Sequence, residues 1–380
     1  MKPRRRHRET LFPPDAFLVT TTLFLMAVGF IFVYSAGVMK AEIYYGSTSH
    51  FLVRQALAAV IGIVTMIVLS RIPADLLERA AGPFAILTFL LLFLVLIPGV
   101  GIKISGARRW LPMPLLGRFQ PSEFARLAVV IVVARYVARN GEEIGTWTGV
   151  GKMLLPPLLF FLLIVAEPDF DTAMMIPALA LVILFVAGLP WRILTGIVGV
   201  LLAGAAALVA AAPYRLERIR GFLDPWSDVQ GKGYHIIQGW TAMGSGGLFG
   251  KGIGQGVQKY GFLPEPHTDF IFAVIGEEIG LIGTVLVTAG FIVLAWRGYR
   301  AALEQKEPFA RYAAAGVTAL ITGQALLNMM VVTGLAPTTG VPLPLISYGG
   351  TSIVFTCAAI GILLNFSRRR VSSGNGRFGG

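Results

Sequence analysis

Long apolar blocks are the feature that most limits what this chain can fold into. A helix needs about 20 mainly apolar residues to cross a bilayer, and only 14% of the 380 residues are charged, against roughly 25% in soluble domains. A single soluble core cannot bury so much apolar surface. The sequence therefore predicts an all-α integral membrane protein of about ten transmembrane helices. The expected spans are 14–37, 52–70, 82–99, 121–138, 153–167, 172–188, 191–212, 269–296, 310–333 and 346–366.

Positive charge at both ends predicts the orientation, because short cytoplasmic segments carry an excess of Lys and Arg. With an even number of spans, both termini lie on one side. We expect a cytoplasmic basic N-terminus (1–13), a polytopic membrane domain (14–367) and a cytoplasmic C-terminal tail (368–380). The terminal cations are Lys2, Arg4, Arg5, Arg6, Arg8, Arg368, Arg369 and Arg370.

Two loops that this orientation places outside the cell are also basic. One covers about 100–120; the other is a large extracytoplasmic loop, 213–268, between spans 7 and 8. Their cations would attract a phosphorylated or otherwise anionic ligand. The alternative is contact with anionic lipid headgroups. In the long loop, glycine alternates with residues such as Trp226, Trp240 and Phe249, which favours short amphipathic helices on the membrane over a flexible loop.

Ionisable residues at or inside the spans are costly, so they are candidates for function. Asp269 opens a span of about 42 Å, longer than the hydrocarbon core of about 30 Å, and can therefore sit at the outer boundary. It could equally be a helix N-terminal acid beside a capping Thr268. Glu277 and Glu278, about two turns deeper, need partners, and a structural and a catalytic role remain equally open.

Further polar groups flank the outer ends of other spans. Glu123 and Arg126 share one helix face, which favours a mutual salt bridge or, alternatively, an Arg126 that binds an anion. Asp169 and Asp171 occupy a short external turn and either cap the next helix or line an outer cavity. The four histidines and Cys357 show no metal-ligand spacing, so no metal ligands are expected.

Seven segments together resemble the SEDS family, named for shape, elongation, division and sporulation. They span nearly the whole chain and occur in family order. The segments are GARRWL (106–111), QPSEFARLA (120–128), EPDFDTAM (167–174), FLDPWSD…GKGYHIIQ (222–238), GSGGLFGKGIGQGVQKY (244–260), LPEPHTDFIFAVIGEEIG (263–280) and PLPLISYGGTS (342–352).

The resemblance implies a ten-helix peptidoglycan glycosyltransferase that joins lipid II units into glycan strands at the outer face of the bacterial cytoplasmic membrane. Asp269 matches the family's essential aspartate and becomes the catalytic candidate. The expected partners are lipid II, a class B penicillin-binding transpeptidase and other division proteins; no nucleic acid is expected. The substrate-binding candidates are Arg108, Arg109, Trp110, Glu123, Arg126, Asp169, Lys232, His267 and Ser347.

The chain departs from the family pattern at three places. Arg126 stands where the family usually has Lys, and its planar head is larger. Asp171 replaces a glycine of the usual PDLGT or PDFGT, which adds an external acid. The segment 337–340 lacks a Lys common in division-type members, whereas 258–278 resembles the division type. We favour the division type, acting at the septum, over the elongation type.

The implied chemistry is attack by the acceptor 4-hydroxyl on C1 of the donor sugar, with a lipid diphosphate leaving group. A carboxylate would take the hydroxyl proton, and cations would stabilise the diphosphate. A divalent cation (Mg or Mn) could assist, although no cofactor is certain. A lipid flippase and a non-catalytic division scaffold remain the alternatives.

Overall fold

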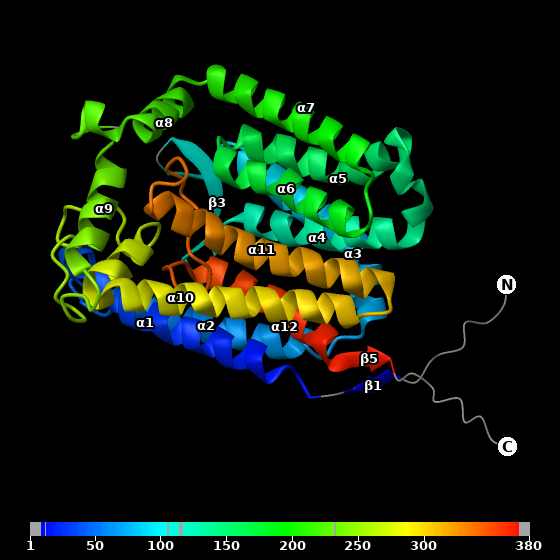
Figure 1. Cartoon of the computed structure of the whole chain (residues 1–380), viewed down its shortest axis with the longest axis horizontal. Helices are drawn as coiled ribbons and strands as arrows, with labels where there is room; N and C mark the ends of the chain where they lie inside the picture. The colour runs from blue at the N-terminus through cyan, green and yellow to red at the C-terminus, as the bar shows by residue number, and fades with distance from the viewer. Residues whose placement is uncertain (1–8, 12, 105, 114–116, 232, 372–380) are drawn as a thin grey trace.

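The computed structural model describes residues 9–371 except 12, 105, 114–116 and 232. The chain forms a bundle of long helices with small strands at either end (Figure 1). The long helices are α1 (Ala16–Tyr45), α2 (His50–Leu69), α3 (Ala74–Leu96), α4 (Pro121–Asn140), α5 (Trp147–Ala166), α6 (Phe170–Val186), α7 (Trp191–Ala210), α10 (Ile271–Glu304), α11 (Pro308–Val332) and α12 (Gly350–Arg368).

Every expected span overlaps one of these helices. Eight of them are long and apolar enough to cross a membrane. The two others are α6, which is apolar but has 17 residues, and α4, which carries Glu123, Arg126, Arg135 and Arg139. The helical membrane fold is thus confirmed, and the count of ten spans stays a prediction.

Local sequence explains where several helices begin. The Asp15 side chain accepts a hydrogen bond from the Leu18 amide at the start of α1, and Thr146 does the same for Gly149 at the start of α5. Pro121 occupies the first position of α4, where a missing N–H removes no helical hydrogen bond. Gly46 ends α1 in the left-handed conformation.

The expected span at 269–296 differs from its helix in two ways. Helix α10 starts at Ile271, and Gly280 interrupts it with φ 75° and ψ −160°. A Cβ at Gly280 would lie 2.5 Å from the backbone nitrogen of Gly250, so the segment after α9 (Tyr234–Gly246) can cross the break only because both residues are glycines. Helix α10 is therefore two helical pieces joined at a kink.

The two ends of the bundle have different structures (Figure 1). At one end, β1 (Glu9–Leu11) pairs antiparallel with β5 (Arg369–Val371), and Arg297 of α10 contacts Asp15. The strand pairing brings together the two segments that are expected to be cytoplasmic. The basic side chains of 1–8 lie outside the described residues.

At the other end lie a three-stranded sheet and the 213–268 segment. The sheet consists of β2 (Ile102–Ile104), β3 (Ala107–Met113) and β4 (Gly117–Phe119), which the apolar pattern did not predict. The segment forms α8 (Pro213–Leu223), α9 and a short 3-10 turn at Pro225–Asp228, so the expectation of short helices is confirmed. Another 3-10 turn, Gly141–Gly145, precedes α5.

The helices pack unevenly around the core. Helix α12 packs against α2, and α11 packs against α10 and α4, where most of its side chains are buried. Helix α7 stands apart: of its residues, all of which the structure describes, Ile193 alone is buried. Its main neighbour is α8. Helix α7 thus leaves nearly all of its apolar surface for lipid to cover.

Candidate functional site

A polar cavity of about 120 Å³ brings together several of the candidates from the sequence. It lies between the β3 strand, the first turns of α4 and α6, α8 and the segment 340–342. Five of the predicted residues line it: Arg109, Trp110, Glu123, Arg126 and Asp169. Residues from distant parts of the sequence therefore converge on one site, at the end of the bundle opposite β1 and β5 (Figure 1).

A second, larger cavity of about 240 Å³ adjoins the first. Arg109, Asp171 and Arg218 line both cavities. The second cavity is mainly apolar and extends to Val209 near the end of α7 and to Leu327 of α11. Arg215 also lines it and lies over the Phe170 ring, 4.8 Å from its centroid. A lining that combines three arginines with apolar side chains suits a ligand with an anionic head and a hydrocarbon chain.

Asp269 lines neither cavity itself, but its side chain lies beside Gly340, which lines the polar cavity. Its Oδ2 atom is 3.7 Å from the position that a Cβ on Gly340 would take. The main chain around Asp269 is fixed by two side chains: Asn328 donates to the Asp269 backbone oxygen at 2.9 Å, and Ser347 donates to the Thr268 backbone oxygen at 2.6 Å. Among the described residues, none donates a hydrogen bond to the Asp269 carboxylate. Its oxygens are therefore available to a ligand.

The surroundings of Asp269 favour its protonated form. Burial raises the pKa of its carboxyl to about 7, and the negative charges of Glu265 and Asp171 act in the same direction. Arg218 opposes this rise in pKa. A carboxyl with a pKa near 7 exchanges a proton readily at neutral pH, which is the property a general base needs.

Asp171 links the cavity wall to the segment beside Asp269. Its Oδ2 atom accepts a hydrogen bond from Arg218 of α8 at 3.1 Å and another from the Gly340 amide at 3.3 Å. Asp171 and Asp269 thus approach the same glycine from two sides. The external acid that the sequence marked as unusual lies next to the catalytic candidate.

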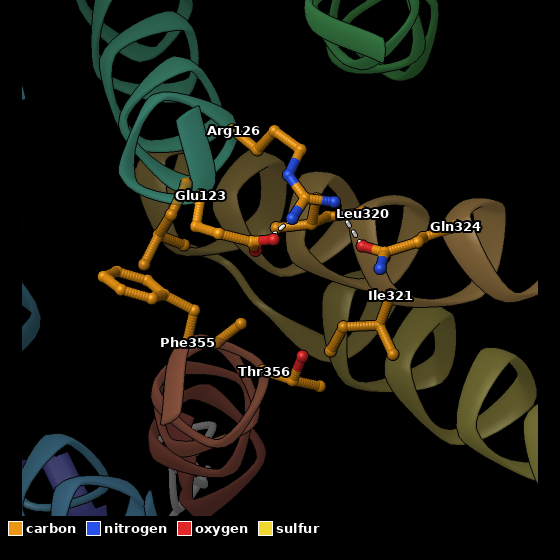
Figure 2. A pocket seen from close by; sticks show the side chains of 9 residues that line it. Glu123, Arg126, Leu320, Ile321, Gln324, Phe355 and Thr356 are labelled. Carbon is orange, nitrogen blue, oxygen red and sulfur yellow. Dashed lines mark hydrogen bonds and ion pairs between the residues drawn. The ribbon is translucent and has the colours of Figure 1, made fainter. Parts of the chain in front are cut away.

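Glu123 and Arg126 form the ion pair that their spacing predicts. Figure 2 shows Arg126 between Glu123 of α4 and Gln324 of α11, with a contact to each. Both charged side chains are buried, and a void of about 20 Å³ lies beside them. Because both side chains also line the polar cavity, the pair places a guanidinium in the cavity wall with its charge balanced by Glu123.

Arg109 and Asp169 form another pair at the cavity mouth. The Arg109 guanidinium lies 3.6 Å from the Asp169 carboxylate and also contacts the Pro168 backbone oxygen. Asp169 caps α6 by accepting from the Thr172 amide and also lines the polar cavity, so it has both of the roles that the sequence left open. Arg109 remains one-third exposed, so it can approach a ligand with the rest of its five N–H donors.

Glu167 is a buried acid beside these groups that the sequence interpretation did not single out. Its side chain is fully buried and, in the described structure, neither carboxyl oxygen has a hydrogen-bond partner. Burial raises the pKa of Glu167 to about 9, and the charge of Asp169 adds to this effect. Glu167 is therefore neutral at pH 7.

The remaining candidates do not line the two cavities. Arg108, next to Arg109 in β3, is absent from both linings. His267 is buried and stacks on Phe51 at 4.6 Å, and burial lowers its pKa to about 4, so it carries no charge at neutral pH. Ser347 contacts backbone atoms, as described above. Lys232 lies outside the described residues.

One expectation about the start of α10 is wrong. Thr268 does not cap the helix: the N-cap residue is Phe270, and the Thr268 hydroxyl donates instead to the Glu265 backbone oxygen at 3.3 Å. The turn 266–270 is held from outside by Asn328 and Ser347, so a local cap is not needed to fix Asp269.

Glu277 and Glu278 have the partners that their burial requires. Glu278 accepts from Lys259 at 2.7 Å and from Ser35 at 2.7 Å. Glu277 accepts from Lys251 at 2.8 Å and from the Val257 amide at 2.9 Å. The glycine-rich segment 250–259 is thereby fastened to the first piece of α10. This geometry favours the structural role over the catalytic one.

Two residues of α11 that position the site were missed in the sequence. Gln324 contacts Arg126, and Asn328 holds the backbone of Asp269. Polar residues four apart lie on one helix face. Their position inside an apolar span was the available signal.

The acids near the cavity do not form a ready metal cage. Among the described residues, no group of three or more His, Cys, Asp or Glu side chains is arranged to hold a metal ion. Asp169 and Asp171 instead contact Arg109 and Arg218. The donor set therefore does not fit a cation held by the protein alone.

Comparison with known proteins identifies the family. The profile of the FtsW/RodA/SpoVE family, described as a cell cycle protein, matches residues 15–372. Stage V sporulation protein E of Bacillus subtilis is 40% identical over 361 residues, 93% of this chain and 97% of that protein. The probable peptidoglycan glycosyltransferase FtsW of Alkalilimnicola ehrlichii is 42% identical over 358 residues, 92% of this chain and 88% of that protein.

Solved structures agree. One, described as the structural coordination of polymerization and crosslinking by a peptidoglycan synthase complex, matches with a TM-score of 0.77 and 30% identity over 93% of this chain and 98% of that chain. The rod shape determining protein RodA of Thermus thermophilus matches with a TM-score of 0.68 and 29% identity, over 93% of this chain and 97% of that chain. The chain is therefore a multi-pass membrane protein that belongs to the SEDS family of cell cycle proteins and resembles its FtsW members.

Proposed function

We propose that this protein is a peptidoglycan glycosyltransferase that polymerises lipid II into glycan strands during cell division. The observation that carries the proposal is the Asp269 carboxylate, with a pKa of about 7, beside Gly340 in the wall of a cavity that arginines also line. Several relatives, including those of two Geobacter species, are named probable peptidoglycan glycosyltransferase FtsW. The activity in those names matches what this site can do chemically.

Asp269 acts as the general base. The 4-hydroxyl of the acceptor sugar is a weak nucleophile until its proton is removed in the transition state. Asp269 takes that proton while the hydroxyl oxygen bonds to C1 of the donor and the bond from C1 to the diphosphate oxygen breaks. Direct displacement inverts the configuration at C1, as in an inverting glycosidase, where one carboxylate activates the nucleophile.

Cations around the two cavities stabilise the departing diphosphate. Arg109, Arg215 and Arg218 line the larger cavity. Each uses one or two of its five N–H donors within the protein, so others remain for phosphate oxygens. Arg126 adds a buried guanidinium to the wall of the polar cavity, where Glu123 balances its charge. The negative charge that develops on the leaving group then meets fixed positive groups.

The larger cavity gives the lipid chain a route from the membrane. It reaches Val209 near the end of α7, a helix that packs mainly against α8. The apolar lining from α6, α7 and α11 suits a polyprenyl chain. The head group would then lie among the arginines, with C1 of the donor toward Asp269.

The site faces the outside of the cytoplasmic membrane, with both termini in the cytoplasm. The pairing of β1 with β5 and the contact between Arg297 and Asp15 at the opposite end support this orientation, as does the excess of cations in the terminal segments. We place the protein at the division septum with a class B penicillin-binding transpeptidase and other division proteins. The matched peptidoglycan synthase complex supports such a partnership.

Polymerisation by purified protein tests the function. The protein, reconstituted in liposomes with and without its transpeptidase, is given lipid II, and the products are sized on a gel. Glycan polymer supports the proposal. Movement of lipid II across the bilayer without polymer indicates a flippase. Neither activity, with the partner present, indicates a scaffold.

A further inference from the structure

We propose that Asp171 is a positioning residue, which anchors Arg218 of α8 and the backbone of Gly340 together and so fixes the wall and the charge balance beside Asp269. The proposal rests on the proposed glycosyltransferase function. It concerns a position where the family pattern has glycine, so the usual family residues do not supply this group.

The contacts of Asp171 join three separate elements. Its carboxylate belongs to the first turn of α6, Arg218 belongs to α8, and Gly340 belongs to the segment before α12. A glycine at position 171 would have no side chain to accept either hydrogen bond. Helix α8 would then lose its ion pair to α6, and Arg218 would be free to move in the cavity wall.

The arrangement also places a second carboxyl group where its charge acts on Asp269. Burial raises the pKa of Asp171, and Arg218 and the Gly340 amide oppose that rise and so favour its ionised form. The amide of Gly340 donates to Asp171, and the same glycine lies beside Asp269. A Cβ placed on Gly340 would be 3.7 Å from Oδ2 of Asp269. The charged groups that affect Asp269 are Glu265 from its own turn, Asp171 from α6 and Arg218 from α8. Asp171 and Glu265 raise the pKa of Asp269, and Arg218 lowers it.

The two partners of the ion pair therefore have opposite effects on the base. Without Asp171, Arg218 is no longer balanced and stabilises the ionised form of Asp269. Without Arg218, the two remaining acids stabilise the protonated form. If the ion pair were purely structural, replacing either partner would change the activity in the same direction, since either replacement breaks the same contact.

The test compares the pH dependence of lipid II polymerisation for the wild type, Asp171→Asn and Arg218→Gln in liposomes. Asparagine keeps the shape and can still accept hydrogen bonds from Arg218 and Gly340, but it has no charge. On the acid side of the plot of rate against pH, the rate rises as the catalytic carboxyl ionises, and this acid limb has a midpoint. We expect that midpoint to fall by about one pH unit in Asp171→Asn and to rise by a similar amount in Arg218→Gln. The double variant should lie between them.

Asp171→Gly tests anchoring separately from charge. It should shift the acid limb in the same direction as Asp171→Asn and also raise the KM for lipid II, because α8 loses its anchor. Glu78→Gln is the matched control: Glu78 pairs with Arg139 at 2.8 Å between α3 and α4, away from both cavities. Its acid limb should coincide with that of the wild type.

Equal rate losses in the two single variants with unmoved midpoints would overturn the proposal and leave Asp171 as a structural residue. If Asp171→Asn does not fold, Arg218→Gln alone decides, since an unmoved or lowered midpoint contradicts the proposal. A wild-type protein that makes no polymer refutes the proposed function instead, so the two failures are distinguishable.

Discussion

Asn328 Nδ2 lies 2.9 Å from the backbone oxygen of Asp269, so a side chain of the membrane helix α11 holds the main chain of the candidate base. The same nitrogen donates to the backbone oxygen of Val341 at 2.9 Å. Asn328 thereby joins the two segments that flank the polar cavity. The position of Asp269 depends on the packed bundle more than on its own turn.

Replacing Asn328 by Ala should lower the rate of polymerisation with little change in yield or monodispersity. A misplacement of a catalytic group by about 1 Å can cost on the order of 100-fold in rate. The matched control is Asn365→Ala, because Asn365 donates to the backbone oxygens of Leu69 and Ile72 at the other end of the bundle. Equal rate losses in the two variants would show that Asn328 contributes only stability.

Arg109 and Arg108 should differ although they are neighbours in β3. Arg109 lines both cavities, whereas Arg108 lines neither. Arg109→Ala should raise the KM for lipid II or slow turnover by about tenfold or more, as expected when a charge-assisted hydrogen bond worth about 1.5–3 kcal/mol is lost. Arg108→Ala serves as the control in the same assay and should change neither parameter. A larger effect for Arg108 would contradict the placement of the diphosphate.

The Glu123 and Arg126 pair predicts non-additive losses of stability. Either single replacement, Glu123→Gln or Arg126→Gln, leaves an unpaired buried charge, which costs about 3–5 kcal/mol. The double variant should recover part of that loss in thermal unfolding measured in detergent. Losses that simply add would mean that the two side chains do not interact.

Glu278 and Lys259 should behave as a structural pair. Lys259 Nζ lies 2.7 Å from the Glu278 carboxylate, and both are buried. Glu278→Gln should lower the thermal stability strongly, since it leaves the buried ammonium without its counterion. Glu143→Gln is the control: its partner Lys152 is mostly exposed, and such pairs contribute less than about 1 kcal/mol. A Glu278→Gln protein with wild-type stability and no activity would reopen a catalytic role.

The apolar blocks predicted where the long helices lie, but not all of their ends. Helix α3 begins at Ala74, eight residues before the expected span at 82–99. Its first turns contain Asp75, Glu78 and Arg79, which reduce hydropathy without preventing a helix. The kink at Gly280 was not predictable from the apolar pattern, because it lies where Gly250 packs against Gly280, a contact between segments far apart in the sequence.

The candidate site was predicted in its chemistry more than in its contacts. Family motifs and charge near the outer boundary pointed to Asp269, Arg109 and Glu123. The contacts of Asp171 could not be predicted from the sequence, since Arg218 is 47 positions away and Gly340 is 169 positions away. Such pairs arise only when the helices pack. The burial of Glu167 could not be predicted either, because the sequence around it is typical of a polar external turn.

The pH dependence of the wild type should reflect Asp269. The base works only when ionised, so the rate should rise as the pH increases through about 7, the pKa of this carboxyl. The effect on stability has the opposite sign. Because folding raises this pKa from 3.8, rising pH between 3.8 and about 7 weakens the folded state through this group. Asp269→Asn removes that effect and should be at least as stable as the wild type above pH 7.

Lipid II polymerisation by Asp269→Asn is the most direct measurement. Asparagine keeps the shape of the side chain but cannot accept the proton from the acceptor hydroxyl. The variant should fold, bind lipid II and bind the transpeptidase like the wild type, yet produce no glycan polymer at any pH. Asp269→Glu should retain a trace of activity, because one methylene misplaces the carboxylate. A folded Asp269→Asn protein that polymerises lipid II at a rate near that of the wild type would contradict the assignment of Asp269 as the base.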